Sequence, residues 1–347
     1  MSNSNYLSKL SSDIVNGLFY ALKNDAKSWY SLQNAGKNDN IDLNEFAKLF
    51  TKLANISSSK DLENLLLSDE LDYETLSYFL TSETIKSYKD FKKEEEKNPN
   101  KGELANSADC FLILFFYSFH LYSKFGMNAL LIKETYEEIK AITEFSHANE
   151  LVYIGNTFFV GLVFSALSYR HKKRRFPNSS YEKIVDDVIE QVSTQFLREE
   201  FKNTKRYFVG IAPLFYELHK EIPASRNLKA IDKRLLQTNN YVIDFVTTLF
   251  SLLLKGYKDN SYQELRNYIV KRKTYTPLFM LLFDVLSKIM EDGLIEDLKE
   301  DYKVYLNNEI YNLLTNLTAP LVNLLESQNK ENEEIRNLQR KYLTSVL

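Results

Sequence analysis

The chain has 347 residues, of which 44% are hydrophobic and 26% are charged, and its formal net charge is −3. This composition excludes wholesale disorder, and the small net charge gives the whole molecule no attraction for a polyanion. Only 9 glycines and 6 prolines accompany 23 phenylalanines and 23 tyrosines, so turn-forming residues are scarce. The composition therefore predicts an all-α protein, a multi-helix bundle in which a small N-terminal helical region precedes a larger helical domain.

Residues 1–88 are predicted to form the small N-terminal helical region. Apolar residues recur at three- and four-residue steps from Leu7 to Leu22, and a shorter apolar stripe runs from Phe46 to Leu53, as on one face of a helix. The first residues lack the basic and apolar segments of a secretory signal. A single cysteine also excludes an intramolecular disulfide. Together these features predict a cytoplasmic protein.

The segment Asn34–Glu45 resembles the second half of an EF-hand calcium loop. Asn38 stands at the fifth position of that loop, Asp42 at the ninth, and Glu45 at the twelfth, where the family places a bidentate carboxylate. The resemblance implies a calcium-type metal site at Asn38, Asp42 and Glu45. The first half departs from the pattern, because Asn34 replaces an aspartate and Asp39 replaces the glycine of the sharp turn. We therefore expect a polar loop in which Asp42 caps the next helix, with the calcium-type site as the alternative.

Residues 89–103 separate this region from the rest of the chain. They are rich in lysine and glutamate and contain a proline and a glycine, so they are predicted to form a charged linker or exposed loop. Residues 104–326 are predicted to form the main helical bundle, since they contain apolar stretches with few charges. The four stretches are Cys110–Tyr122, Leu151–Tyr169, Tyr241–Leu254 and Pro277–Met290. Asp284 interrupts the last one and needs a partner if it is buried. Residues 327–347 are predicted to form a charged C-terminal helix or tail.

The stretch Leu151–Tyr169 contains no charge and precedes a basic segment, so its length and its flank fit a membrane span. The polar residues within it reduce the free energy gained on insertion. A buried helix of a bundle fits the same pattern, and there Gly155 and Gly161 would let neighbouring helices approach. The mean hydropathy of the whole chain, −0.34, also favours a core helix. We therefore expect a core helix, with a membrane anchor at 151–169 as the alternative.

Five basic residues follow this stretch: Arg170, Lys172, Lys173, Arg174 and Arg175. Residues 170–206 contain ten basic and six acidic residues, an excess of four positive charges. Such a patch is suited to binding phosphates, which gives a nucleic-acid-binding or nuclease-like defence protein as an alternative function. His171 lies in the cluster, but the Arg-x(4–6)-His spacing of helical HEPN-type ribonucleases is absent. For the cluster itself we expect a charged turn between helices that keeps the bundle soluble, with phosphate binding as the alternative.

No motif of a common enzyme class occurs in the sequence. It contains no Gly-rich phosphate loop, Gly-x-Ser-x-Gly, His-Glu-x-x-His or zinc-binding cysteines. The lone Cys110 lies in an apolar stretch, where burial makes a thiol inert. We therefore expect a non-catalytic protein without a cofactor that binds a protein partner, as a subunit of a larger assembly or as a host- or phage-directed interaction protein. The many tyrosines and phenylalanines suit a contact surface wherever they are exposed.

Overall fold

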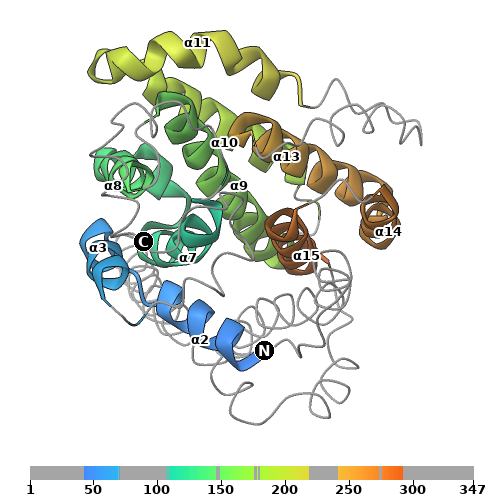
Figure 1. Cartoon of the computed structure of the whole chain (residues 1–347). Coiled ribbons are helices and arrows are strands. Elements are labelled where there is room, and N and C mark those ends of the chain that lie inside the picture. Colours follow the sequence, from blue (N-terminus) through green and yellow to red (C-terminus); the bar gives the residue numbers. More distant parts are fainter. Residues whose placement is uncertain are drawn as a thin grey trace, which may run out of the picture.

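The computed structural model describes residues 43–68, 70, 108, 110–145, 149–175, 178, 180–218, 241–272 and 276–291. Within these ranges the chain forms helices and no strand (Figure 1), which confirms the predicted all-α bundle. The α-helices are α2 (Leu43–Ala54), α3 (Ser59–Leu67), α7 (Phe111–Phe125), α8 (Lys133–Glu144), α9 (Glu150–Arg175), α10 (Tyr181–Phe196), α11 (Lys202–Tyr216), α13 (Val242–Asp259), α14 (Tyr262–Arg272) and α15 (Pro277–Met290). Two short 3-10 helices are η1 (Gly126–Leu131) and η2 (Glu199–Phe201).

Helix α9 runs through the middle of the bundle. It contacts α7, α8, α10, α11, α13 and α15, and every residue from Val152 to Arg170 is buried. Within the part of the chain that the structure describes, Glu150–Arg170 is the one segment long and apolar enough to cross a membrane. Inside the protein, 94% of its most apolar 18-residue stretch is buried. Because a helix that is apolar on all sides must be covered on all sides, this burial favours the expected core helix over a membrane anchor.

Two glycines of α9 lie where neighbouring helices come closest. A Cβ atom on Gly155 would lie 2.5 Å from Val242 Cγ2 in α13, and one on Gly161 would lie 2.5 Å from Val188 Cγ1 in α10. Both distances are far below the carbon–carbon contact distance of about 3.5–4.0 Å, and a valine side chain has little freedom to move aside. These glycines therefore determine how closely α10 and α13 pack on α9, as the sequence predicts.

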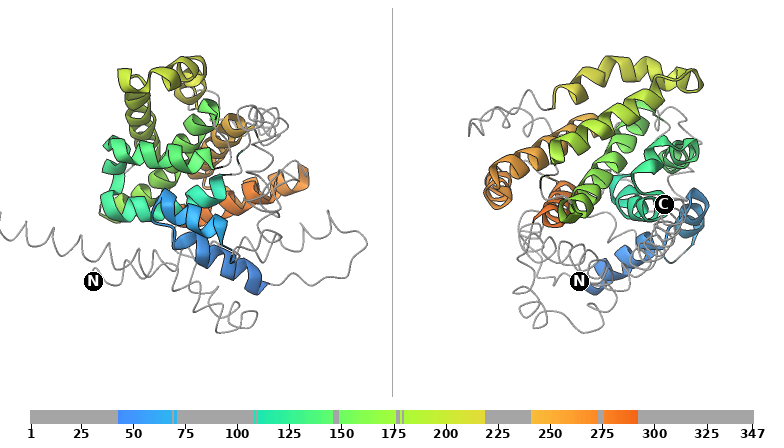
Figure 2. Two further views of the ribbon diagram at one scale, coloured as in Figure 1. Left: turned by 60° about the vertical axis from the view of Figure 1, so that its left-hand side comes forward. Right: turned by 180° about the vertical axis from the view of Figure 1, so that it is seen from behind.

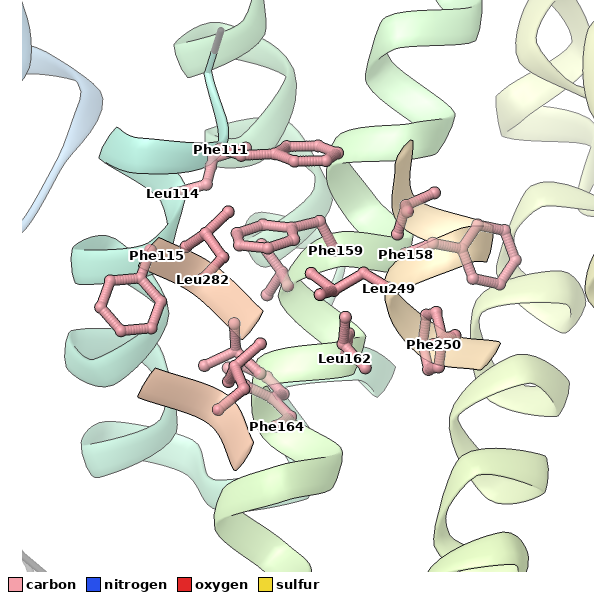
Figure 3. Packing of buried hydrophobic residues seen from close by; sticks show 14 of the residues in the cluster. Phe111, Leu114, Phe115, Phe158, Phe159, Leu162, Phe164, Leu249, Phe250 and Leu282 are labelled. Carbon is pink, nitrogen blue, oxygen red and sulfur yellow. The ribbon is translucent and has the colours of Figure 1, made fainter. Parts of the chain in front are cut away.

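Phenylalanines fill the space between α9 and its neighbours. Phe111 of α7 stacks on Phe159 of α9 with ring centroids 4.2 Å apart, and it meets Phe245 of α13 edge-on at 5.1 Å. Figure 3 shows Leu249 of α13 and Leu282 of α15 in the same layer. A buried phenylalanine removes about 150–250 Å² of surface from water, so this layer contributes much of the stability of the fold.

A buried ion pair joins α14 to α15. The Arg266 guanidinium donates from Nε to both carboxylate oxygens of Asp284, at 3.0 and 3.1 Å, and both residues are buried. This pair gives Asp284 the partner that its apolar surroundings require. Removing one member of such a pair leaves an uncompensated buried charge, which typically destabilises a protein by about 3–5 kcal/mol.

The described part of the N-terminal region packs against the main bundle. Helix α2 lies on α7, where the Phe50 and Phe116 ring centroids are 5.4 Å apart. Helix α3 lies on α8, and the Ser59 amide donates to Glu138 Oε2 across 2.7 Å, so a carboxylate of α8 occupies the positive end of α3. The predicted linker 89–103 and tail 327–347 lie outside the described residues. The division into regions 1–88 and 104–326 stays a prediction.

Candidate interaction surface

Helix α11 lies along one edge of the described helices in Figure 1 and in both views of Figure 2. It packs on α9 and α10 through a face that buries Thr204, Phe208 and Phe215. Phe215 stacks on Phe158 of α9 with ring centroids 3.6 Å apart, and Phe208 contacts Phe196 of α10 at 5.6 Å. These aromatic contacts hold α11 in place, because each removes a large apolar side chain from water.

The outward side of α11 is apolar as well. The segment Tyr207–Tyr216 contains no charged residue. Its exposed large side chains are Tyr207 (46% exposed), Val209 (58%), Leu214 (38%) and Tyr216 (51%). We define these four residues, together with the exposed Gly210 and Pro213, as the α11 surface.

The four large side chains of the α11 surface lie on two flanks of the helix. Tyr207 and Leu214 are seven residues apart and share one flank, and Val209 and Tyr216 share the other in the same way. Gly210 and Pro213 lie between the flanks, on the side opposite Phe208 and Phe215. The surface is therefore a shallow centre of small residues bordered by larger apolar groups.

This concentration of exposed apolar residues distinguishes α11 from the rest of the described chain. The other exposed large hydrophobic residues there are Leu67, Leu131 and Leu197, and they belong to α3, η1 and the residue after α10. Four large side chains that are about half exposed leave on the order of 400 Å² of apolar area uncovered. Contiguous exposed patches of this size are often functional in soluble proteins. The α11 surface is therefore the best candidate for an interaction site.

The predicted calcium-type site lies largely outside the described residues. Asn38 and Asp42 fall outside them, and Glu45 lies in the first turn of α2, where only its backbone is described. Helix α2 begins at Leu43, directly after Asp42, which is the position that the helix-capping alternative requires. No group of three or more His, Cys, Asp or Glu side chains able to hold a metal occurs among the described residues. Calcium binding at Asn38, Asp42 and Glu45 stays a prediction.

The predicted basic cluster is helical, and the proposed turn between helices is wrong. Residues 170–175 form the end of α9, because lysine and arginine are good helix formers and their charge suits the negative end of a helix. Arg170 is only 8% exposed, and its Nη1 donates to the Glu291 carbonyl at the end of α15 across 3.0 Å. Its guanidinium therefore points into the protein. The side chains of Lys172, Lys173, Arg174 and Arg175 lie outside the description, so phosphate binding by these four stays a prediction.

Burial perturbs the pKa values of two titratable side chains of α7, Tyr117 and His120. Burial raises the pKa of the Tyr117 phenol, and Glu138 and Asp61 raise it further. Burial also lowers the pKa of the nearby His120, and Lys124 adds to this shift. A phenol with a raised pKa stays protonated and is a poor base at neutral pH. Cys110 is buried, as expected, and its sulfur lies 4.0 Å from the Ile142 carbonyl oxygen.

Comparison with known proteins gives no family for this chain. No protein-family model matches it, and no curated protein is significantly similar.

The segment Tyr207–Tyr216 is absent from the sequence-based predictions of a functional site, although one signal in the sequence marks it. Gly210 and Pro213 both interrupt an apolar helical run, and such residues weaken a helix unless something requires them. The α11 surface is therefore identified by the exposure of its side chains in the structure and not by the sequence pattern.

Proposed function

We propose that this protein is a non-catalytic, cytoplasmic helical protein that acts by binding another protein through the α11 surface. The observation that supports this proposal is the exposure of two tyrosines, a valine and a leucine along the two flanks of the outward side of a single helix. Tyrosine is enriched at protein interfaces because its large, rigid ring combines apolar area with a hydroxyl group. The buried Phe208 and Phe215 hold the helix in place, so little ordering would be needed when a partner binds.

The size of the α11 surface indicates a contact of modest strength. Covering about 400 Å² of apolar area contributes roughly 10 kcal/mol before the costs of association. The loss of translational and rotational freedom alone costs about 4–15 kcal/mol. The α11 surface by itself therefore supports a reversible complex, and a permanent complex would need further contacts around it.

Photocrosslinking inside the native cells tests this proposal. A photoreactive amino acid in place of Val209 is expected to give discrete protein adducts. The same replacement at Leu131, which is 53% exposed in η1, is the matched control and is expected to give none. The Val209 adducts should disappear with Leu214→Asp and persist with Leu67→Asp. Absence of protein adducts at Val209 would contradict the proposal.

Nucleic-acid binding through Lys172, Lys173, Arg174 and Arg175 makes a different prediction. Retention on heparin or RNA would then fall steeply as salt is raised, because each phosphate contact releases counterions. Replacing these four residues with glutamine would abolish the retention, whereas Leu214→Asp would not change it. Photoadducts at Val209 that nuclease removes would also favour this alternative. Protein adducts together with a shallow salt response would favour the α11 surface.

A further inference from the structure

The residues from Arg206 to Glu217 form an inverted repeat, in which similar residue types follow in nearly the same order from either end. From Arg206 inward the residues are Arg, Tyr, Phe, Val, Gly and Ile, and from Glu217 inward they are Glu, Tyr, Phe, Leu, Pro and Ala. Each position therefore matches its counterpart in character, except that the two end residues carry opposite charges. The centre of this inverted repeat falls between Ile211 and Ala212.

The local symmetry of the repeat coincides with the exposed side of the helix. Arg206, Gly210, Pro213 and Glu217 follow one another at steps of four, three and four residues, so they lie along one line of the helix. That line is opposite the buried Phe208 and Phe215. It is also flanked evenly by the large side chains of the α11 surface. A twofold axis through this line would relate the outward half of α11 to itself.

Two identical helices that pack antiparallel through this line, with a twofold axis between them, would match apolar to apolar. Tyr207 would lie beside the partner's Leu214, and Val209 would lie beside the partner's Tyr216. A twofold interface requires this self-complementarity, since each contact occurs twice. The surface therefore fits a second copy of itself without any further complementary sequence.

The close approach of a second helix would explain why residue 210 is a glycine. A Cβ atom at Gly210 would meet nothing within 4 Å in the protein, so the packing of its own chain does not require a glycine. An exposed glycine inside a helix costs about 1 kcal/mol relative to alanine. Glycine is favoured where another backbone approaches closely. The centre of the α11 surface is therefore shaped for contact with a second helix.

The charges at the ends of the repeat fit an antiparallel partner. Arg206 and Glu217 are eleven residues apart, about 16 Å along the helix, so they cannot pair with each other within one chain. Neither forms an ion pair with another described residue. Glu217, directly after the last residue of α11, also lies at the negative end of the helix dipole, which is unfavourable for a carboxylate. An antiparallel copy would place each Arg206 beside the partner's Glu217, so that each charged side chain would gain an oppositely charged neighbour.

We propose that the α11 surface is covered by α11 of a second copy of this chain, in an antiparallel twofold pair. This inference rests on the proposed function and adds that the bound protein is identical. Two surfaces of about 400 Å² each lie below the roughly 1,200 Å² that a standard stable interface buries. The dimer is therefore weak and depends on concentration.

Sedimentation equilibrium over a range of concentrations tests this pairing on the full chain. The wild type is expected to pass from monomer to dimer as its concentration rises. Leu214→Asp should keep the chain monomeric, whereas Leu131→Asp should leave the dimer unchanged. Arg206→Glu and Glu217→Arg should each raise the dissociation constant about tenfold, because each places two like-charged contacts in the dimer. The double variant Arg206→Glu/Glu217→Arg should return close to the wild-type value.

Several outcomes would overturn the pairing without affecting the proposed function. A wild type that stays monomeric at every concentration would do so, as would charge reversals that have no effect or are not rescued by the double variant. If photoadducts at Val209 then contain a different protein, the surface still binds a partner and only the identical copy is excluded. Circular dichroism of each variant confirms that the exposed substitutions leave the helices folded. A monomeric chain without adducts at Val209 would contradict both proposals.

Discussion

Helices α9 and α11 contain similar amino acids and lie in opposite environments. Each has an apolar run without charge that includes aromatic residues and glycine. In α9 the run is buried on every side, whereas in α11 only the side with Phe208 and Phe215 is buried. Gly155 and Gly161 face valines of other helices, but Gly210 faces open space. Among the described residues, an apolar helix is therefore buried on all sides where other helices surround it, and one side stays exposed where no helix lies against it.

Truncating one aromatic residue in each helix is the strongest test of this contrast. Phe159→Ala in α9 removes a ring stacked on Phe111 at 4.2 Å and is expected to lower the free energy of unfolding by about 3–5 kcal/mol. Tyr216→Ala in α11 removes a half-exposed ring and is expected to change it by less than about 0.5 kcal/mol. Urea unfolding at low protein concentration measures both values. Similar losses for the two variants would mean that α11 is as fully packed as α9.

Alkaline pH tests the burial around α9 in a second way. Burial raises the pKa of the Tyr136, Tyr153 and Tyr181 phenols above the usual value near 10. In the unfolded chain these phenols lose their protons near pH 10, whereas in the folded protein they keep them. The folded state then binds more protons, so stability falls as the pH rises above 10. The expected loss between pH 10 and pH 11 is about 1 kcal/mol for each such tyrosine, or roughly 3 kcal/mol from these three. Tyr117 and Tyr262, whose pKa values burial also raises, add to this loss.

The variant Tyr153→Phe provides the control for this pH dependence. It removes one buried phenol and should reduce the loss between pH 10 and pH 11 by about 1 kcal/mol. The measurement is urea unfolding at both pH values, with phenolate absorbance recorded during the transition. Equal losses for the variant and the wild type would show that Tyr153 ionises without unfolding.

Alanine substitutions at the glycines are expected to give the smallest changes in the free energy of unfolding, with opposite signs in α9 and α11. Gly155→Ala and Gly161→Ala should destabilise the protein by about 1–2 kcal/mol, because the added methyl group overlaps Val242 or Val188. Gly210→Ala should stabilise the monomer by about 0.5–1 kcal/mol, because alanine favours the helix and meets no neighbour. Thermal unfolding of the three variants measures these differences. Destabilisation by Gly210→Ala in the monomer would show that this glycine is already packed.

Most of the described fold follows from the positions of apolar residues in the sequence. The predicted stretches Cys110–Tyr122 and Pro277–Met290 match α7 (Phe111–Phe125) and α15 (Pro277–Met290) closely. The stretch Leu151–Tyr169 matches α9 but ends too early, because its basic flank continues the helix to Arg175. The requirement that a buried Asp284 have a partner is also confirmed, although the sequence does not show that the partner is Arg266. That pairing depends on how α14 lies against α15.

The candidate site was less predictable, because its signal is exposure. The segment Tyr207–Tyr216 resembles a core helix in composition, and a hydropathy pattern alone does not distinguish a covered face from an uncovered one. Conversely, Arg170 appears in the sequence as part of a basic cluster, whereas its side chain is buried against the end of α15. Both cases turn on which helices are neighbours, which the spacing of residues along one helix does not specify.

The amino-acid sequence by itself determined that this protein is helical and which segments needed burial, because helix periodicity and apolar composition act over a few residues. Only the tertiary structure decided which apolar surface found a partner within the chain. Among the described residues seven neighbouring elements contact α9, while the outward side of α11 remains exposed. The physical reason is that burial is a property of the whole arrangement, since the free energy of covering apolar area depends on what lies against it and not on the residue alone.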